Sequence, residues 1–290
     1  GQNNLSMAKQ AYESSRLLMG EPDEIDSRYS NILLMLGHVE TFSGNYKDAR
    51  KLYDNSIEFL NFRQKPTYFQ FPVFTYFYER DYEQAIIAFS KMRSEINTSD
   101  QDQEWKTENI TLMEENIFVS HLHNQDEQGA NKSLQKIAGF KRIELNSYLT
   151  SGASREQLLA LKNNNDIYLQ ELRLWKDIIF GASNVEQQLN RLKTLLEKNL
   201  AQDPNAMTLY HKYSGYAAIM AGDDQAAIRH YSVISNIEMD DDNYHSYFYA
   251  IALRGSGDTE KSSAILKRVA ENTFATRGAA LVQMLAKRQL

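Results

Sequence analysis

Histidines close to carboxylates are the side chains that, by type and spacing, are best suited to hold a metal ion. His121 and His123 are two residues apart, so on a helix they point about 200° apart and do not chelate one ion. Asp241 and His245 are four residues apart, beside the acidic run Asp240–Asp242, and could share a divalent cation. Alternatively, these aspartates cap the helix that follows, where carboxylates favour the positive end of the dipole. We favour capping.

The sequence lacks the common catalytic motifs. It has no GxSxG elbow, no GxxxxGK phosphate loop and no HExxH zinc motif, and Gly255 and Gly257 follow a predicted helix rather than a strand. It also contains no cysteine, which excludes thiol catalysis, disulfides and cysteine-ligated zinc. We therefore expect a protein that is not an enzyme and that uses no metal and no cofactor.

The composition favours long helices joined by short connections. The 290 residues include 13 glycines and 4 prolines, too few turn formers for a many-stranded β sandwich or barrel. No apolar stretch reaches the roughly 18 residues that a membrane span needs. A formal net charge of −6 argues against a general binder of nucleic acid or of anionic membranes. We therefore expect no nucleic-acid partner and no direct membrane insertion.

A pattern of small and aromatic residues recurs about every 35 residues. Residues 33–57 align with residues 211–235, and weaker copies follow at Gln70–Ser94 and Ser246–Ala270. A small residue in each copy would let one helix approach the next, and a large residue four positions after the alanine or serine of the second helix would fill the core. The matched residues are Gly37 and Gly215; Gly44, Gly222 and Gly257; Ala49, Ala85, Ala227 and Ser262; and Tyr53, Phe89, Tyr231 and Leu266.

This ordered set resembles the tetratricopeptide repeat, a helix–turn–helix unit of about 34 residues. Gly44 and Gly222 stand where the first helix would end with a positive φ, and Asn45 and Asp223 stand where the second helix would be capped. The resemblance implies an all-α fold, an α-α superhelix built as a right-handed solenoid of helical hairpins.

The regularity of the repeats suggests a division of the chain. We expect an N-terminal tetratricopeptide-like sub-array over 1–138 and a C-terminal one over 165–290, which ends in a capping helix at Thr273–Gln289. Residues 139–164 are the least regular, and we interpret them as an irregular connection with a short helix at Arg155–Lys162.

Pro72 interrupts an otherwise helical aromatic stretch. A proline in a helix interior removes a hydrogen bond and clashes with the preceding turn, at a cost of about 3 kcal/mol. We therefore expect this helix to begin late, near Phe71, with Pro72 in its first turn.

The resemblance implies that the first helices of successive repeats line a concave groove, and helical spacing then selects its residues. Aromatic side chains dominate this set, and such rings are common anchors at interfaces. The alternative is that they pack against one another in the core. We expect the double change Phe74→Ala with Tyr78→Ala to weaken partner binding without unfolding the protein. The predicted groove residues are His38, Phe42, Phe74, Phe77, Tyr78, Lys212, Tyr216, Tyr244, Tyr247 and Arg254.

These observations predict a non-enzymatic scaffold that binds a peptide or protein segment. Some tetratricopeptide domains hold a peptide carboxylate between lysine and asparagine, but Tyr216 stands where that asparagine is expected, which argues against such a clamp. Residues 95–127 are acidic and residues 249–290 are basic, an asymmetry that could orient a partner. The alternative is the helical regulatory or targeting part of a larger exported enzyme or sensor. We favour an exported chain whose signal has been removed.

Overall fold

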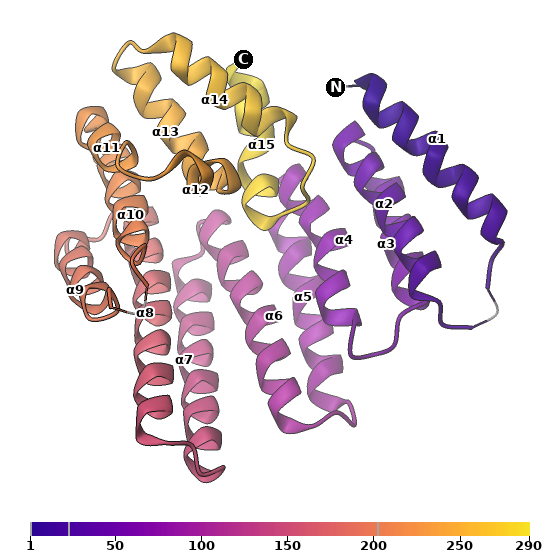
Figure 1. Cartoon of the computed structure of the whole chain (residues 1–290), viewed down its shortest axis with the longest axis horizontal. Coiled ribbons are helices and arrows are strands. Elements are labelled where there is room, and N and C mark those ends of the chain that lie inside the picture. Colours follow the sequence, from indigo (N-terminus) through magenta and orange to yellow (C-terminus); the bar gives the residue numbers. More distant parts are fainter. Residues whose placement is uncertain (1, 23, 202) are drawn as a thin grey trace.

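All regular secondary structure in the described residues is α-helical. The computed structural model describes residues 2–22, 24–201 and 203–290, and within them it forms fifteen helices and no strand (Figure 1). The all-α prediction is confirmed. No helix in these ranges is long and apolar enough to cross a bilayer. The helices are α1 (Gln2–Met19), α2 (Ser27–Ser43), α3 (Tyr46–Glu58), α4 (Lys65–Glu79), α5 (Tyr82–Thr98), α6 (Gln103–His123), α7 (Glu127–Thr150), α8 (Arg155–Ile179), α9 (Val185–Glu197), α10 (Met207–Met220), α11 (Asp224–Tyr231), α12 (Asn236–Asp241), α13 (Asn243–Gly255), α14 (Thr259–Glu271) and α15 (Arg277–Gln289).

Successive helices pair as antiparallel hairpins with short connections, and each hairpin packs against the next along the chain (Figure 1). The hairpins are α2–α3, α4–α5, α6–α7, α8–α9, α10–α11 and α13–α14.

Helices cross closely wherever the repeat pattern places a small residue. Ala49, Ala85 and Ala227 are fully buried, and Tyr53 and Tyr231 fill the space beside them with 1% of their surface exposed. Gly37 faces the Tyr53 ring so closely that a Cβ atom there would lie 2.5 Å from Cε1 of that ring. The predicted pairing of small and aromatic residues is therefore confirmed at these crossings.

The turns inside the hairpins keep one backbone conformation even where the residue type changes. Gly44 and Gly222 adopt positive φ angles of 85° and 78°, as expected. Arg80 occupies the equivalent position after α4 with a φ of 61°. Asp223 caps α11 through the amide of Ala226, whereas the side chain of the residue before α3 makes no such cap bond.

The prediction of a late start at Pro72 is wrong. Helix α4 begins at Lys65, with Pro66 in its first turn, and continues through Pro72 to Glu79. Pro72 removes one backbone hydrogen bond, but the turn around it buries Val73 and Phe74, and this burial offsets the loss. The hydroxyl of Thr75 donates a hydrogen bond to the Pro72 carbonyl at 2.6 Å.

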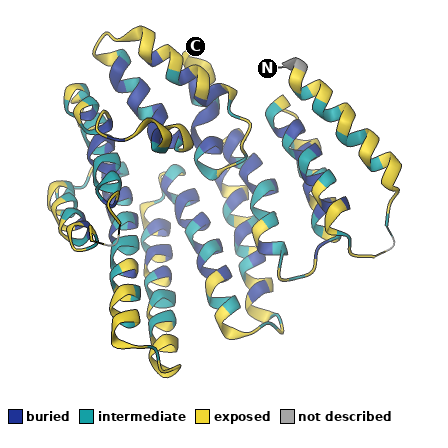
Figure 2. Ribbon diagram, in the orientation of Figure 1, coloured by how far each residue is buried: buried dark blue, intermediate teal, exposed yellow. Residues whose placement is uncertain are grey.

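The prediction of an irregular connection over 139–164 is also wrong. Helix α7 continues to Thr150, and α8 already starts at Arg155, so only residues 151–154 are non-helical. Ser154 starts α8 with a capping box, in which its hydroxyl and the Gln157 side chain each bond the other residue's backbone. Long exposed surfaces on both helices weaken the apolar periodicity here, which explains why the sequence looks irregular (Figure 2).

The C-terminal end of the chain returns to its N-terminal half. Helix α15 packs against α13 and α14 and also against α4, about 200 residues earlier in the chain (Figure 1). As a result, one hydrophobic cluster runs from Val73 to Ala286. Smaller clusters surround Tyr53 and Tyr231.

Two glycine-to-alanine changes should move stability in opposite directions. Gly37→Ala should lower the free energy of unfolding by about 1–3 kcal/mol, because Tyr53 is buried and held by hydrogen bonds and does not yield to the new methyl group. Gly139→Ala, in open space within α7, should raise it by about 0.5–1 kcal/mol. Urea unfolding followed by circular dichroism measures both, and a stabilising Gly37→Ala would contradict the close crossing.

A polar groove as candidate functional site

Six of the predicted groove residues lie in the core. Each has 1–8% of its surface exposed, and each ring packs against helices of the same chain: the ring centroid of Phe77 lies 5.7 Å from that of Tyr82, and Tyr216 lies 4.5 Å from Phe248. The prediction that these rings line an open groove is therefore wrong, because the chain itself covers them. The six are Phe74, Phe77, Tyr78, Tyr216, Tyr244 and Tyr247.

The two remaining aromatic candidates lie on α2 and are half-buried. His38 Nδ1 shares a hydrogen bond with the Tyr53 hydroxyl at 2.8 Å, and its ring lies 6.4 Å from that of Phe42. Burial lowers the pKa of His38 to about 4, so its imidazole is neutral near pH 7. His38 therefore contributes to the packing of α2 on α3.

The two charged candidates both bind groups of the same chain. Lys212 Nζ lies 2.9 Å from a carboxylate oxygen of Asp242. The Arg254 guanidinium donates to the carbonyl oxygen and to the side-chain amide oxygen of Gln289, each at 2.8 Å, and so ties α13 to the end of α15.

The capping interpretation of the acidic run holds for Asp242 alone, because Asp240 and Asp241 lie in the last turn of α12. A carboxylate oxygen of Asp242 accepts a hydrogen bond from the His245 amide at 3.0 Å, and Asp240 pairs with Arg268. The histidines of α6 separate, because His121 contacts Asp126 while His123 lies among aromatic rings. Among the described residues, no three histidine or acidic side chains gather where they could hold a metal ion.

An ion pair and a chain of hydrogen bonds hold the returning C-terminal helices in place. The Arg277 guanidinium, in the first turn of α15, lies 2.7 Å from a carboxylate oxygen of Glu115 on α6. Farther along, the Trp175 indole donates to the Tyr244 hydroxyl at 3.2 Å, and that hydroxyl donates to Tyr216 at 3.1 Å. We call the contact of α15 with α4 and α6 the closing seam.

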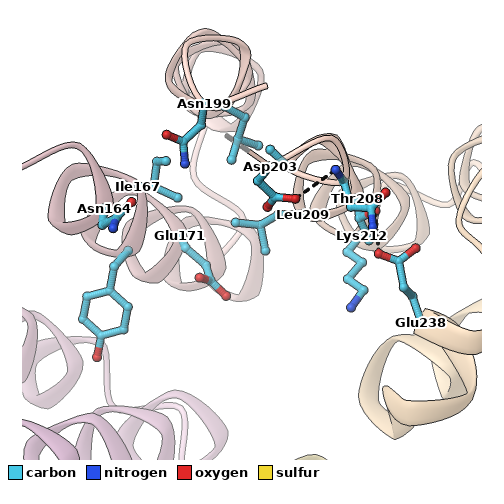
Figure 3. A pocket seen from close by; sticks show the side chains of 13 residues that line it. Asn164, Ile167, Glu171, Asn199, Asp203, Thr208, Leu209, Lys212 and Glu238 are labelled. Carbon is cyan, nitrogen blue, oxygen red and sulfur yellow. Dashed lines mark hydrogen bonds between the residues drawn. The ribbon is translucent and has the colours of Figure 1, made fainter. Parts of the chain in front are cut away.

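Two neighbouring cavities remain open beside the seam, and together we call them the polar groove. The first, of about 580 Å³, lies among α6, α7 and α8. The second, of about 380 Å³, lies among α8, α9, α10 and α12 (Figure 3). Tyr168 lines both, so the two cavities adjoin at α8.

Carboxylates outnumber basic side chains in this groove. Of the lining residues that the structure describes, only Lys141 and Lys212 are basic, and each already pairs with a carboxylate: Lys141 with Glu144 at 3.0 Å and Lys212 with Asp242 at 2.9 Å. The groove therefore presents a negative surface to any ligand. The acidic lining residues are Glu104, Glu108, Glu115, Glu144, Glu171, Asp203 and Glu238.

Two of these carboxylates have opposite electrostatic environments. Burial favours the neutral form of Glu115, but the Arg277 charge and the Tyr168 hydroxyl, which donates at 2.6 Å, together hold the pKa of Glu115 below its usual range. Burial raises the pKa of Glu171 to about 7, even though the Tyr213 hydroxyl donates to it at 3.0 Å. The negative charge of Glu115 is therefore already balanced by Arg277, whereas Glu171 has no basic partner of its own among the described ion pairs.

Sequence reasoning named only Lys212 among the residues of this groove. The others were missed because α6 and α7 depart from the glycine-containing repeat pattern and because the start of α8 was interpreted as a connection. One signal was present: the acidic stretch 95–127 supplies Glu104, Glu108 and Glu115 to the first cavity.

The double change Phe74→Ala with Tyr78→Ala should destabilise the fold, contrary to the expectation from sequence. Both rings are at least nine-tenths buried, and truncation of one buried phenylalanine costs about 3–5 kcal/mol. Thermal unfolding should show an earlier midpoint than in the wild type and in the surface variant Ile87→Ala. An unchanged midpoint would mean that the rings do not support the core.

Arg277→Ala should loosen the closing seam. The pair is partly exposed, with 28% and 18% of the two side chains accessible, so we expect a loss of about 1–3 kcal/mol. Hydrogen exchange should become faster in α15 and α4, while α2 and α3 remain protected. Arg288→Ala, at the exposed far end of α15, is the control, and equal exchange in both variants would contradict the role of the Arg277 pair.

Comparison with known proteins does not place the chain in a described group. A scan against protein-family models finds no match, and a search of curated proteins finds no similar sequence. The candidate site therefore rests on its own geometry.

Proposed function

We propose that this chain is a non-enzymatic scaffold of tetratricopeptide-like hairpins, arranged as a right-handed solenoid, that binds a segment of another protein. The segment is extended, carries lysine or arginine side chains and lies in the polar groove. This differs from the site expected from sequence, because the aromatic rings are covered and the open surface is acidic.

The repeat pattern supports the scaffold part of this proposal. Hairpins follow one another along the chain, and equivalent crossings use a buried small residue beside a buried large one, as Ala49 with Tyr53 and Ala227 with Tyr231. The equivalent turns also share positive φ angles at Gly44, Arg80 and Gly222. These features are typical of arrays in which each unit packs only on its neighbours.

The observation that carries the binding part is the pair of adjoining cavities on consecutive hairpins. Tyr168 lines both cavities, and the proposed segment lies across this residue, from the cavity among α6, α7 and α8 to the one beside α10. Asparagine and threonine side chains line the way; Asn109 and Thr111 already donate to carbonyl oxygens of α6, so their side-chain oxygens serve as acceptors for a ligand. A bound backbone needs such partners once water is displaced.

The charge of the polar groove determines which side chains a partner should carry. Lys141 and Lys212 are neutralised by their own pairs, so the remaining carboxylates give the groove an excess of negative charge. Basic segments are therefore attracted and acidic ones repelled, and added salt weakens the attraction at exposed positions.

Peptide selection tests this function. Random twelve-residue peptides displayed on phage are panned on the purified chain, and the affinity of enriched peptides is measured by fluorescence anisotropy. Enriched peptides should carry lysine or arginine, and Glu108→Lys in the first cavity should weaken them about two- to tenfold.

A matched charge reversal separates the groove from the general field of the protein. Glu260→Lys on α14 makes the same change in net charge at an exposed position outside both cavities. It should leave peptide affinity nearly unchanged. Equal losses in the two variants, or enrichment of acidic or purely apolar peptides, would contradict binding in the polar groove.

A further inference from the structure

The carboxylate of Glu171 projects into the second cavity from α8. Glu171 lies on α8 on the same face as Asn164, Ile167 and Tyr168, since these residues are spaced by three or four positions. Figure 3 shows its carboxylate pointing into the space between α8 and α10. One oxygen accepts the hydrogen bond from Tyr213 on α10. A ligand in the cavity therefore meets this carboxylate directly.

The two cations whose charges act on Glu171 are already paired with other acids. Arg277 pairs with Glu115 at 2.7 Å, and Lys212 pairs with Asp242 at 2.9 Å. In the ranges that the structure describes, no lysine or arginine nitrogen forms an ion pair with Glu171. The position for a cation beside this carboxylate is therefore not taken by the chain itself.

The walls of the cavity suit a long side chain with a charged end. Ile167 and Leu209 supply apolar surface on α8 and α10, and Asp203 and Glu238 add negative charge. Lysine and arginine have apolar stems and positive ends, so they match both parts. A volume of about 380 Å³ gives room for one such side chain and water.

We propose that the second cavity is a subsite for one lysine or arginine side chain of the bound segment, with its cation paired to Glu171. This inference rests on the proposed function and specifies which part of the groove recognises the basic side chain. Ile167 and Leu209 contact the stem, while the Tyr213 hydroxyl holds the carboxylate in place.

The environment of Glu171 makes this recognition sensitive to pH near neutrality. Burial raises its pKa to about 7; Tyr213 and Lys212 from α10 and Arg277 from α15 oppose this shift, and Glu115 from α6 adds to it. A cation binds the ionised carboxylate, so the bound form has a lower pKa than the free form. Affinity should therefore be constant above pH 7 and fall as pH decreases through 7, by up to about tenfold per unit.

The test compares two small probes that differ in charge. Nα-acetyl-arginine amide and its neutral isostere Nα-acetyl-citrulline amide are titrated into the full chain, with ¹³C-labelled glutamate observed by NMR. The arginine probe should shift the signals of Glu171 on α8 and Glu238 on α12, and it should lower the titration midpoint of Glu171. The citrulline probe should do neither. Equal binding of the two probes would overturn the subsite.

Substitution gives a second, independent measurement. Glu171→Gln keeps the shape and the acceptor for Tyr213 but removes the charge, so it should weaken the arginine probe about ten- to a hundredfold. Glu186→Gln, exposed on α9 outside the cavity, should leave it unchanged. Preserved affinity in Glu171→Gln would overturn the proposal, as would preferential binding of Nα-acetyl-glutamate amide, which would point to Lys212 and an anion.

Failure of the subsite and failure of the proposed function give different results. If selected basic peptides bind and respond to Glu108→Lys but not to Glu171→Gln, the groove is retained and the subsite is wrong. If no selected peptide binds, the proposed function fails whether or not the arginine probe occupies the second cavity.

Discussion

The return of α15 to α4 is the contact on which the arrangement of free and covered surfaces depends. Apolar packing supplies most of its area, since residues of α15 such as Val282 and Ala286 belong to the same core cluster as Val73 and Phe77 of α4. Arg277 fixes the orientation of α15 in this contact, because its guanidinium must pair with the Glu115 carboxylate when the two groups are partly desolvated. The aromatic rings lie inside this arrangement, whereas acidic side chains of α6, α8 and α12 line the polar groove.

Glu115 and Glu171 show how one groove holds two carboxylates with different tasks. Arg277 and Tyr168 compensate Glu115, so it stays ionised and serves the closing seam. Among the described residues, Glu171 has the neutral Tyr213 hydroxyl as its direct partner, and burial outweighs the charges of Arg277 and Lys212, so its ionised form is costly. A group in that state gains most from a ligand that brings the missing positive charge. The structural and the proposed binding carboxylate thus differ by their partners rather than by residue type.

Close helix crossings make this surface possible. Where Gly37 or Gly215 meets the ring of Tyr53 or Tyr231, two helices lie near enough to leave no gap. Between α6 and α8 the chain instead has longer helices with polar side chains, and the first cavity opens there. Tight crossings at some hairpins and a looser one at another thus divide the molecule into a packed part and the proposed binding surface.

The sequence alone determined the helical class, the close crossings and the hairpin turns, because these depend on residues a few positions apart. Gly37, Ala49 and Tyr53 lie on two consecutive helices and pack at one crossing. Their spacing in the sequence therefore predicts that crossing. The sequence did not determine that Pro72 lies inside a helix or that 139–164 is helical, since tertiary burial and capping outweigh local propensity there. Nor did it determine the groove: helical spacing shows which rings share a face, but not what covers that face. Only the tertiary structure decided this, because helices far apart in the chain meet there: α15 packs against α4 from about 200 residues away, and Trp175 of α8 packs against Tyr244 of α13.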